Sequence, residues 1–432
     1  KWFPETLERQ IAFMEEQQCA LSFTSYILID NDDRETGIVI APPSMSFRQL
    51  KLDNQIGCLT AIYDSKLLGR KYFMPFIRKR QDWGLFLTIL RDTGKKAYSL
   101  QEPLAYYRDT KGSVSSNKLG LIKYVMALMN GARLGIAGQS TGLSQMAYNE
   151  ALAYAKDRKQ FGKAIIEFPA VYDMLAIMKA KLDAGRALYY ATARYVDIYK
   201  IWEDIERDRK AEGGKLEPAE RTEYKTFARL ADAFTPVAKG MTSEYANQNA
   251  YDGIQVHGGS GFMLEYTCQR LYRDARILSI YEGTTQLQCV AAGRYITNGT
   301  YGQIIADILE KGEAGMAMSS LAEAAECDAN WCGAEFAALK ERMVKAAEKY
   351  NEAVAYTNDQ KDDEFKNLVL RHLYEMAADI IMSLLLIGDA TKNPELFAKS
   401  AKVYNRYAAA EIEKHYNFIM SLSVENLTDY QA

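Results

Sequence analysis

Residues 134–157, LGIAGQSTGLSQMAYNEALAYAKD, indicate the fold class of this chain most clearly. Apolar residues recur there at three- and four-residue spacing, and many are alanine, which predicts a helix that packs closely against other helices. The same pattern fills residues 169–200 and continues, with breaks, towards the C-terminus. Residues 213–218 should end one helical hairpin, and Pro236 should interrupt the next helix. We therefore predict a mainly α-helical fold.

The first 123 residues have a different pattern. Residues 20–29 (ALSFTSYILI) have the β-branched and aromatic content of a strand, and the aspartates at 30, 32 and 33 predict a hairpin turn after it. Further predicted elements are strands at 37–41, 57–63 and 96–107, and helices at 6–16 and 82–90. We therefore predict three parts: a small α/β segment over 1–123, a helical bundle over 124–300 and an accessory helical region over 301–432.

The composition excludes several classes of protein. With 432 residues, 48% of them apolar and 25% charged, the chain is typical of a globular protein. Its most apolar run, residues 377–388, is too short to span a membrane and contains Asp379. Six scattered cysteines without a CxxC motif predict reduced thiols, no metal site and a cytoplasmic location. The net charge of −3 gives no indication of nucleic-acid binding.

One carboxylate has a sequence environment that suits catalysis. In residues 275–288, ARILSIYEGTTQLQ, Glu282 follows apolar Ile280 and Tyr281. A carboxyl group desolvated in an apolar slot has a raised pKa, which suits a general base that removes a carbon-bound proton. The spacing fits equally a solvated glutamate before a helix that Thr284 or Thr285 caps. The residues alone leave both interpretations open.

Two further motifs are ambiguous by themselves. Residues 157–163 (DRKQFGK) place cations at a helix end, where they can interact with the helix dipole or bind an anionic pyrophosphate. Residues 254–262 (IQVHGGSGF) form a glycine-rich turn that permits close approach of a cofactor, although such turns are common. His257 lies in this motif and is expected in a loop or an interface.

Taken together, the three motifs resemble the C-terminal helical domain of the acyl-CoA dehydrogenases. The resemblance begins at residues 128–133 (LMNGAR) and covers about residues 125–300. Residues 301–432 resemble the extra C-terminal region of the branch that includes the methylmercaptopropionyl-CoA dehydrogenases. The resemblance implies an FAD-dependent α,β-dehydrogenation of an acyl-CoA thioester, with Glu282 as the base and the flavin as the hydride acceptor.

The same resemblance implies roles for other residues. Those matching FAD-binding positions are Arg158, Gln160, Phe161, Gln255, Gly258, Gly259, Thr284 and Gln286. Of these, Arg158 would reach the pyrophosphate, and Gln255, Gly258 and Gly259 the adenosine end, of a neighbouring subunit's cofactor. Those matching substrate positions are Met129, Asn130 and Arg133. The implied partners are an acyl-CoA substrate, an electron-transfer flavoprotein or similar acceptor, and a second copy of the chain in a homo-oligomer.

The N-terminal segment resembles a different family. Residues 1–120 resemble the C-terminal half of an inverting family 2 glycosyltransferase, through stretches such as 77–87 (IRKRQDWGLFL) and 107–118 (YRDTKGSVSSNK). This resemblance implies that Asp82 deprotonates an acceptor hydroxyl, framed by Arg80, Trp83 and Arg108. From the residues alone, Asp82 is equally a favourable charge at a helix N-terminus.

The two resemblances meet at residues 121–126 without a linker rich in glycine, serine or proline. An acyl-CoA dehydrogenase has a helical and a β-domain before its C-terminal domain, and a family 2 glycosyltransferase has its nucleotide-binding strands before the matched half. A natural fusion usually joins complete domains across a linker, so of a natural fusion, an artificial chimera and an incomplete sequence we expect one of the last two. The glycosyltransferase activity, dependent on a nucleotide sugar, and a non-catalytic helical module are the alternatives to dehydrogenation.

Overall fold

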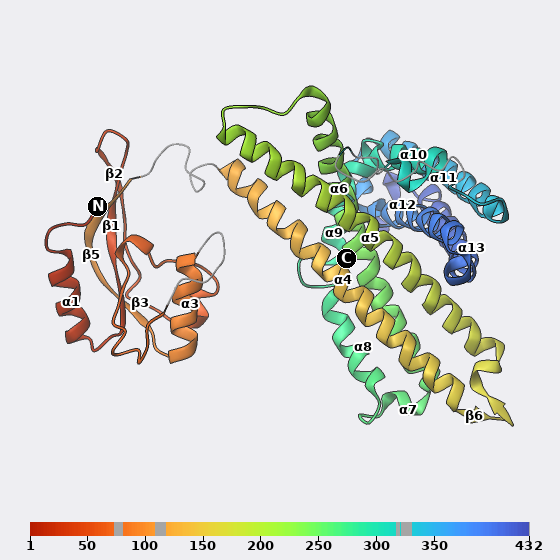
Figure 1. Ribbon diagram of the computed structural model, residues 1–432, viewed down its shortest axis with the longest axis horizontal. Coiled ribbons are helices and arrows are strands. Elements are labelled where there is room, and N and C mark those ends of the chain that lie inside the picture. Colours follow the sequence, from red (N-terminus) through yellow and green to blue (C-terminus); the bar gives the residue numbers. More distant parts are fainter. Residues whose placement is uncertain (73–80, 109–117, 317–319, 321–330, 432) are drawn as a thin grey trace. The chain divides into compact units, whose positions relative to one another are not determined.

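The computed structural model describes residues 1–72, 81–108, 118–316, 320 and 331–431, with the backbone alone at 81 and 118–130. It contains two compact units, Lys1–Val125 and Met126–Ala432, which Figure 1 shows in colours that follow the sequence. Helix α4 (Lys118–Asp157) begins in the first unit and continues into the second. The change of pattern near residue 123 thus falls inside a helix.

A mixed sheet forms the centre of the first unit. Strand β1 (Leu21–Ile29) runs parallel to β5 (Ala97–Arg108) and antiparallel to β2 (Glu35–Val39) and β4 (Ile62–Tyr63), and β3 (Ser44–Met45) is antiparallel to β5. The first five residues of β1 are buried, as in a strand covered on both faces. Figure 1 shows helices α1 (Thr6–Glu16) and α3 (Gln81–Thr93) on opposite sides of the sheet.

The sequence predicted most elements of this unit, but neither β3 nor the short helix α2 (Phe47–Leu50), and the strand predicted at 37–41 is β2, two residues earlier. Residues 57–63, predicted as one strand, form the 3-10 helix Cys58–Thr60 followed by the two-residue strand β4. The aspartate turn is confirmed, because the side chain of Asp30 accepts hydrogen bonds from the backbone N–H groups of Asp32 at 2.8 Å and Arg34 at 3.0 Å.

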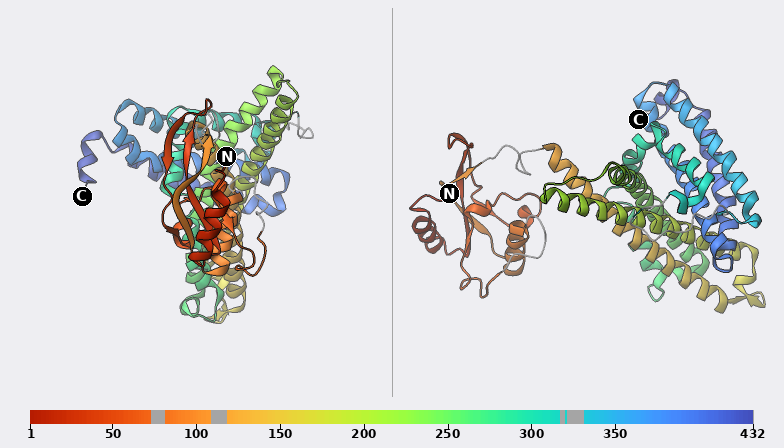
Figure 2. Two further views of the ribbon diagram at one scale, coloured as in Figure 1. Left: turned by 90° about the vertical axis from the view of Figure 1, so that its left-hand side faces the viewer. Right: turned by 45° about the horizontal axis from the view of Figure 1, so that its top comes forward.

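The second unit is a bundle of helices. After α4 and the short hairpin β6 (Lys159–Gln160) and β7 (Lys163–Ala164), its helices are α5 (Pro169–Ala211), α6 (Pro218–His257), α7 (Gly259–Phe262), α8 (Thr267–Leu278), α9 (Thr285–Thr297), α10 (Thr300–Met316), α11 (Ala337–Asp359), α12 (Asp363–Lys392) and α13 (Pro394–Met420). The helices α12 and α13 pack against each other and against α5, and Figure 2 shows this layer from two further directions. Alanines at positions 180, 184, 187 and 191 line the buried face of α5, so α5 and α6 can approach closely.

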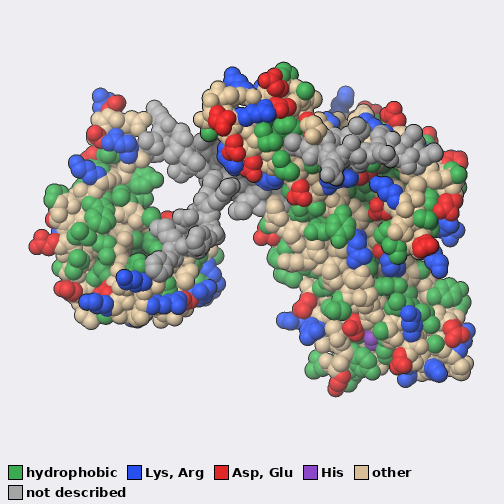
Figure 3. Space-filling model, viewed as in Figure 1, with side chains coloured by type: hydrophobic (Ala, Val, Ile, Leu, Met, Phe, Trp, Pro, Cys, Tyr) green, Lys and Arg blue, Asp and Glu red, His purple; other side chains and the backbone are tan. Residues whose placement is uncertain are grey.

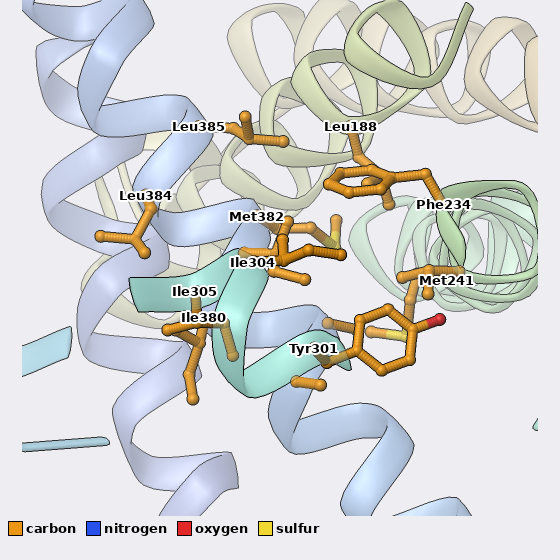
Figure 4. Close-up of a cluster of buried hydrophobic side chains, with 14 of the residues drawn as sticks. Leu188, Phe234, Met241, Tyr301, Ile304, Ile305, Ile380, Met382, Leu384 and Leu385 are labelled. Carbon is orange, nitrogen blue, oxygen red and sulfur yellow. The ribbon is translucent and has the colours of Figure 1, made fainter. Parts of the chain in front are cut away.

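The largest core lies where α5, α6, α10 and α12 meet. Figure 4 shows the side chains that fill it, among them Leu188, Phe234, Tyr301, Ile380 and Met382. All five are buried, and they come from all four helices. This core joins the predicted bundle over 124–300 to the predicted accessory region, because residues of α12 pack directly on α5 and α6.

Proline 236 lies inside α6, so the prediction that it interrupts this helix is wrong. Proline usually costs an interior helix several kcal/mol, because its ring clashes with the preceding turn and one N–H is lost. Here side chains from other helices satisfy backbone carbonyls near the proline. The hydroxyl of Tyr301 donates to the carbonyl of Ala233 at 2.6 Å, and that of Tyr374 donates to the carbonyl of Pro236 at 3.0 Å.

Within the described residues, no helix combines the length and the apolar character needed to cross a membrane. The same part of the chain holds no group of three or more His, Cys, Asp or Glu side chains arranged to bind a metal ion.

Candidate active site

Glu282 lies in a short loop between α8 and α9. Its φ angle of 54° and that of Gly283, 93°, are both in the left-handed region. The loop is closed by a 3.1 Å hydrogen bond from the N–H of Thr285 to the carbonyl of Ser279. Thr284 is the N-cap of α9, and its side chain accepts from the N–H of Leu287 at 3.4 Å. The helix-cap interpretation of this segment is therefore confirmed for Thr284.

Three buried side chains hold the carbonyl groups of this loop. The Lys239 ammonium donates to the Gly283 carbonyl at 2.7 Å. The Gln288 amide donates to the same carbonyl at 3.0 Å and to that of Glu282 at 3.3 Å. The guanidinium Nε of Arg133 lies 3.5 Å from the Glu282 carbonyl. These donors come from α6, α9 and α4, so three helices determine the loop conformation.

Close packing makes glycine necessary at position 283. A Cβ atom there would lie 2.8 Å from the amide nitrogen of Gln288 and 3.7 Å from a guanidinium nitrogen of Arg133. The positive φ angle also disfavours any residue with a Cβ. The Glu-Gly pair thus allows the chain to bring two successive carbonyls onto the buried donors.

The two cations below the loop are strongly desolvated. Burial lowers the pKa of Lys239 to about 8, with the neighbouring charge of Arg133 acting in the same direction and the charges of Glu244 and Glu282 opposing it. Burial also lowers the pKa of Arg133, although the charges of Glu282 and Asp232 oppose this shift. Arginine remains charged despite such a shift, so a positive potential lies beneath the loop.

The Glu282 side chain is exposed, although its charge still raises the pKa of Lys239 and of Arg133. The expectation of an apolar slot is therefore wrong for the residues that the structure describes. Ile280 is 42% exposed, and Tyr281 is directed towards α4, where its hydroxyl donates to the side chain of Gln139. Within the described residues, the buried donors bind the loop carbonyls and not the carboxylate, which leaves the Glu282 side chain in solvent.

Of the predicted substrate residues, the structure brings Arg133 to the Glu282 loop. It is 5% exposed and contacts the protein backbone. Met129 and Asn130 lie on α4, and their side chains are outside the described residues.

The candidate cofactor residues form two groups. The first group lies where α4 and α6 end. Arg158 precedes strand β6, Gln160 lies in β6, and Phe161 lies at the turn of the hairpin. Gln255 and Gly258 lie at the end of α6, and Gly259 is the first residue of α7. All six are exposed, Phe161 to 93%. The ring of Tyr154 in α4 stacks on that of His257 at 4.2 Å, and its hydroxyl lies 3.3 Å from that of Ser260. These contacts bring the DRKQFGK and GGSGF motifs together.

The second group, Thr284 and Gln286, adjoins Glu282 at the start of α9. Helix α7 lies shortly before the first turn of α8, and the Glu282 loop follows the last residue of α8. The two groups therefore lie at opposite ends of α8 (Figure 1). Twelve helical residues span about 18 Å. His257, expected in a loop or an interface, is instead the last residue of α6 and is buried, with its Nδ1 atom 2.7 Å from the Gly253 carbonyl.

In the first unit, Asp82 lies in the first turn of α3, as a charge favourable to a helix N-terminus does. The indole of Trp83 donates to the Leu50 carbonyl at 2.8 Å. The guanidinium of Arg108 donates to the Asp30 carbonyl at 2.7 Å and pairs with Asp33. Arg80 lies outside the described residues.

Sequence reasoning missed Lys239 and Gln288. Lys239 is a single cation within PVAKGM, residues 236–241, which are otherwise apolar or glycine. A lysine in such a segment of a helix is a signal that it has a buried partner, but the partner, a carbonyl 44 residues later in the chain, cannot be read from the pattern.

Comparison with known protein families gives two matches, both within residues 122–427. Residues 122–200 and 217–296 match the family described as "Acyl-CoA dehydrogenase, C-terminal domain", and residues 314–427 match "Acyl-CoA dehydrogenase C terminal". Two parts of the helical unit thus match family descriptions of acyl-CoA dehydrogenase C-terminal domains.

Two curated relatives share about a third of their residues with this chain over its central part. The Caffeyl-CoA reductase-Etf complex subunit CarC of Acetobacterium woodii is 36% identical over 176 residues, which are 40% of this chain and 39% of that protein. The 3-methylmercaptopropionyl-CoA dehydrogenase of Ruegeria pomeroyi is 36% identical over 191 residues, 42% of this chain and 30% of that protein. The chain therefore spans well under half the length of these relatives.

A solved structure shows the same fold. The acyl-CoA dehydrogenase of Bacillus anthracis, determined in complex with FAD, superposes with a TM-score of 0.50 at 21% identity, over 68% of this chain and 49% of that one. The second unit is accordingly a helical bundle of the acyl-CoA dehydrogenase type.

Proposed function

We propose that the helical unit serves an FAD-dependent enzyme that dehydrogenates an acyl-CoA thioester, with Glu282 as the catalytic base. The observation that carries the proposal is the Glu282 loop itself. Its backbone is fixed from below by Lys239, Gln288 and Arg133, while the carboxylate is presented outward. A base held in one orientation on a rigid backbone is the arrangement that proton abstraction requires.

The carboxylate and the backbone N–H of Glu282 are both available to contact a thioester. Within the described part of the chain, neither its carboxylate nor its backbone N–H forms a hydrogen bond. The carboxylate can remove the α-proton, and the N–H can donate to the thioester carbonyl and stabilise negative charge that develops on the oxygen. As the double bond forms, a hydride leaves the β-carbon, and FAD is the group that accepts it when bound.

The exposed residues at the α4 and α6 ends suit FAD. A Cβ atom at Gly258 or Gly259 would meet no atom within 4 Å, so a ligand can approach this backbone closely. The guanidinium of Arg158 has the fork geometry that binds phosphate oxygens. The exposed ring of Phe161 offers an apolar surface beside it.

The separation of the two groups along α8 supports a homo-oligomer. In the family resemblance, Arg158, Gln255, Gly258 and Gly259 of the first group contact the cofactor of a neighbouring subunit, while Thr284 and Gln286 lie beside Glu282. Two groups about 18 Å apart, the first exposed and the second combining half-buried Thr284 with exposed Gln286, are compatible with one cofactor from each subunit. The proposed assembly is therefore one in which subunits complete each other's FAD sites.

The electron acceptor we propose is an electron-transfer flavoprotein or a similar carrier. Support comes from the relative in Acetobacterium woodii, whose printed name places it in an Etf complex. The absence of a membrane-crossing helix among the described residues agrees with the predicted cytoplasmic location, which remains a prediction.

The replacement Glu282→Gln tests the central proposal. In the flavin-loaded protein we expect substrate-dependent flavin bleaching, measured anaerobically with a panel of acyl-CoA thioesters, to slow by roughly 10²–10⁴-fold. FAD content should stay unchanged, because the amide keeps the shape of the side chain. The matched control is Glu395→Gln in α13, an exposed glutamate far along the chain. Bleaching by Glu282→Gln at the wild-type rate would disprove the role of this carboxylate.

The glycosyltransferase interpretation of residues 1–120 remains the alternative, and it rests on the sequence resemblance alone, because the position of Asp82 in the first turn of α3 equally suits a helix N-terminal charge. Its discriminating observation is binding of a nucleotide sugar with a divalent cation, measured by calorimetry. The domain boundaries 1–123, 124–300 and 301–432, and the chimeric origin of the chain, likewise remain predictions.

A further inference from the structure

We propose that Lys239 is a positioning residue for Glu282: its buried ammonium group binds the Gly283 carbonyl and thereby holds the carboxylate outward for catalysis. This inference rests on the proposed role of Glu282 as the base. It adds a residue on α6 to a site whose other parts lie on α4, on α9 and in the loop.

The first support is the environment of the lysine. Lys239 is 0% exposed, although lysine is among the residues least often fully buried. No carboxylate of the described residues lies within ion-pair distance of its ammonium. Its hydrogen bond goes instead to the Gly283 carbonyl at 2.7 Å. Burying a charge without an ion pair raises the free energy of the folded state. We infer that the hydrogen bond that fixes the loop is the reason why a lysine is kept at this position.

The second support is the rigidity of the helix that carries the lysine. Gly240 allows Tyr374 of α12 to pack directly on α6, because a Cβ atom at 240 would lie 2.1 Å from the tyrosine oxygen. The same hydroxyl donates to the Pro236 carbonyl at 3.0 Å. Backbone contacts on either side of Lys239 are thereby fixed, so the aliphatic stem begins from a well-defined point.

The third support is that Lys239 and Gln288 bind the loop carbonyls differently. Gln288 donates to both carbonyls, at 3.0 Å and 3.3 Å, whereas Lys239 makes the shorter contact to Gly283 alone. The amide oxygen of Gln288 is itself buried without a hydrogen-bond partner among the described residues. Loss of the ammonium would leave Gly283 with this one weaker donor, and the left-handed turn at Glu282 could then relax.

The experiment compares Lys239→Met, Lys239→Gln and Lys239→Arg in the full chain. Without flavin, hydrogen exchange of a peptide covering residues 279–287 reports loop mobility, and we expect about tenfold faster exchange in Lys239→Met. In the flavin-loaded protein we expect kcat for acyl-CoA oxidation to fall 10- to 100-fold with little change in KM, because substrate contacts are intact. Lys239→Arg, which keeps a cationic donor, should recover at least a third of the wild-type kcat, and Lys239→Gln should lie between.

The matched control is Lys181→Met in α5. Lys181 is also buried, at 6% exposed, but its ammonium donates to the side chain of Gln248 at 2.6 Å, away from the Glu282 loop. This variant should leave loop exchange and kcat unchanged, because the ammonium of Lys181 binds neither of the two loop carbonyls.

The outcomes separate this inference from the proposed function. If Glu282→Gln abolishes bleaching while Lys239→Met keeps both normal loop exchange and normal kcat, the positioning role is wrong and the base assignment stands. If Glu282→Gln retains activity, the base assignment itself fails. A Lys239→Met protein that does not fold is replaced by Lys239→Gln, for which normal exchange and normal kcat would equally overturn the inference.

Discussion

At the scale of single residues, the helical unit contains polar groups that its apolar surroundings should disfavour. Asp379 is the extreme case, being 2% exposed in the middle of α12. Its carboxyl group accepts hydrogen bonds from the hydroxyls of Tyr245 and Tyr404, both at 2.9 Å. These two bonds satisfy the group without an ion pair, so its protonation should depend on whether the chain is folded.

Asp379 should make stability depend on pH. Burial raises its pKa from 3.8 to about 7, with the charge of Glu375 adding to the rise and the two tyrosines and His415 opposing it. Between pH 4 and 7 the unfolded chain has released this proton while the folded chain retains it, so stability falls as pH rises through this window.

The replacement Asp379→Asn tests this expectation. Because three pKa units correspond to about 4 kcal/mol, the variant should gain up to about that much relative to wild type between pH 4 and 7. Urea unfolding at several pH values measures the gain. Asp197→Asn, at an exposed position in α5, is the control and should show no such trend. Parallel pH profiles for wild type and Asp379→Asn would contradict the shifted pKa.

At the scale of elements, one contact couples the accessory helix α12 to the helix that carries Lys239. The Gly240–Tyr374 contact leaves no space for a side chain at 240, since the tyrosine oxygen and Cζ would lie 2.1 Å and 3.1 Å from a Cβ. The accessory region is therefore a structural support of the α6 segment beneath the Glu282 loop.

A double-mutant cycle measures this coupling. Gly240→Ala should cost about 1–3 kcal/mol, as overpacked cores do. Tyr374→Phe should cost about 1 kcal/mol for the lost hydrogen bond to Pro236. The double variant should be less destabilised than the sum by about 1 kcal/mol, because removing the hydroxyl relieves part of the clash. Gly388→Ala in α12, where a Cβ meets no atom within 4 Å, is the control and should be neutral or stabilising. Strict additivity of the Gly240 and Tyr374 changes would show that the contact does not couple the helices.

At the scale of the whole molecule, exposed apolar residues surround the candidate FAD-binding end of the bundle. Figure 3 shows hydrophobic side chains at this end, over α7. Phe262 is 82% exposed, Leu264 83% and Phe161 93%. Large apolar side chains gathered in this way are typical of an interface, which agrees with the proposed homo-oligomer.

The proposed assembly predicts that Leu264→Ser weakens self-association and FAD retention together. Burying one leucine contributes roughly 1.5–3 kcal/mol, so the dissociation constant from analytical ultracentrifugation should rise about 10- to 100-fold. Leu52→Ser is a close control, because this leucine is also 83% exposed but lies in the first unit. Equal effects of the two changes, or no effect of either, would rule out an interface at this end.

The sequence by itself determined the elements and the identity of the motifs. Helix α5 begins at Pro169, where the helical spacing of residues 169–200 predicts it, and β1 begins one residue after its predicted start. Periodicity succeeds there because burial of one face is a local property of the chain. The motif around Glu282 was recognisable for a similar reason, since its residues are contiguous.

Only the tertiary structure decided what surrounds those elements. Pro236 lies inside α6, where hydroxyls from α10 and α12 bind the carbonyls of Ala233 and Pro236, and neither donor is close in sequence. The carbonyls of the Glu282 loop are bound by Lys239 and Arg133, which lie 43 and 149 residues from Glu282 in the chain, while the Glu282 side chain is exposed. Desolvation and hydrogen bonding depend on every neighbour in space, whereas a sequence pattern reports only neighbours along the chain.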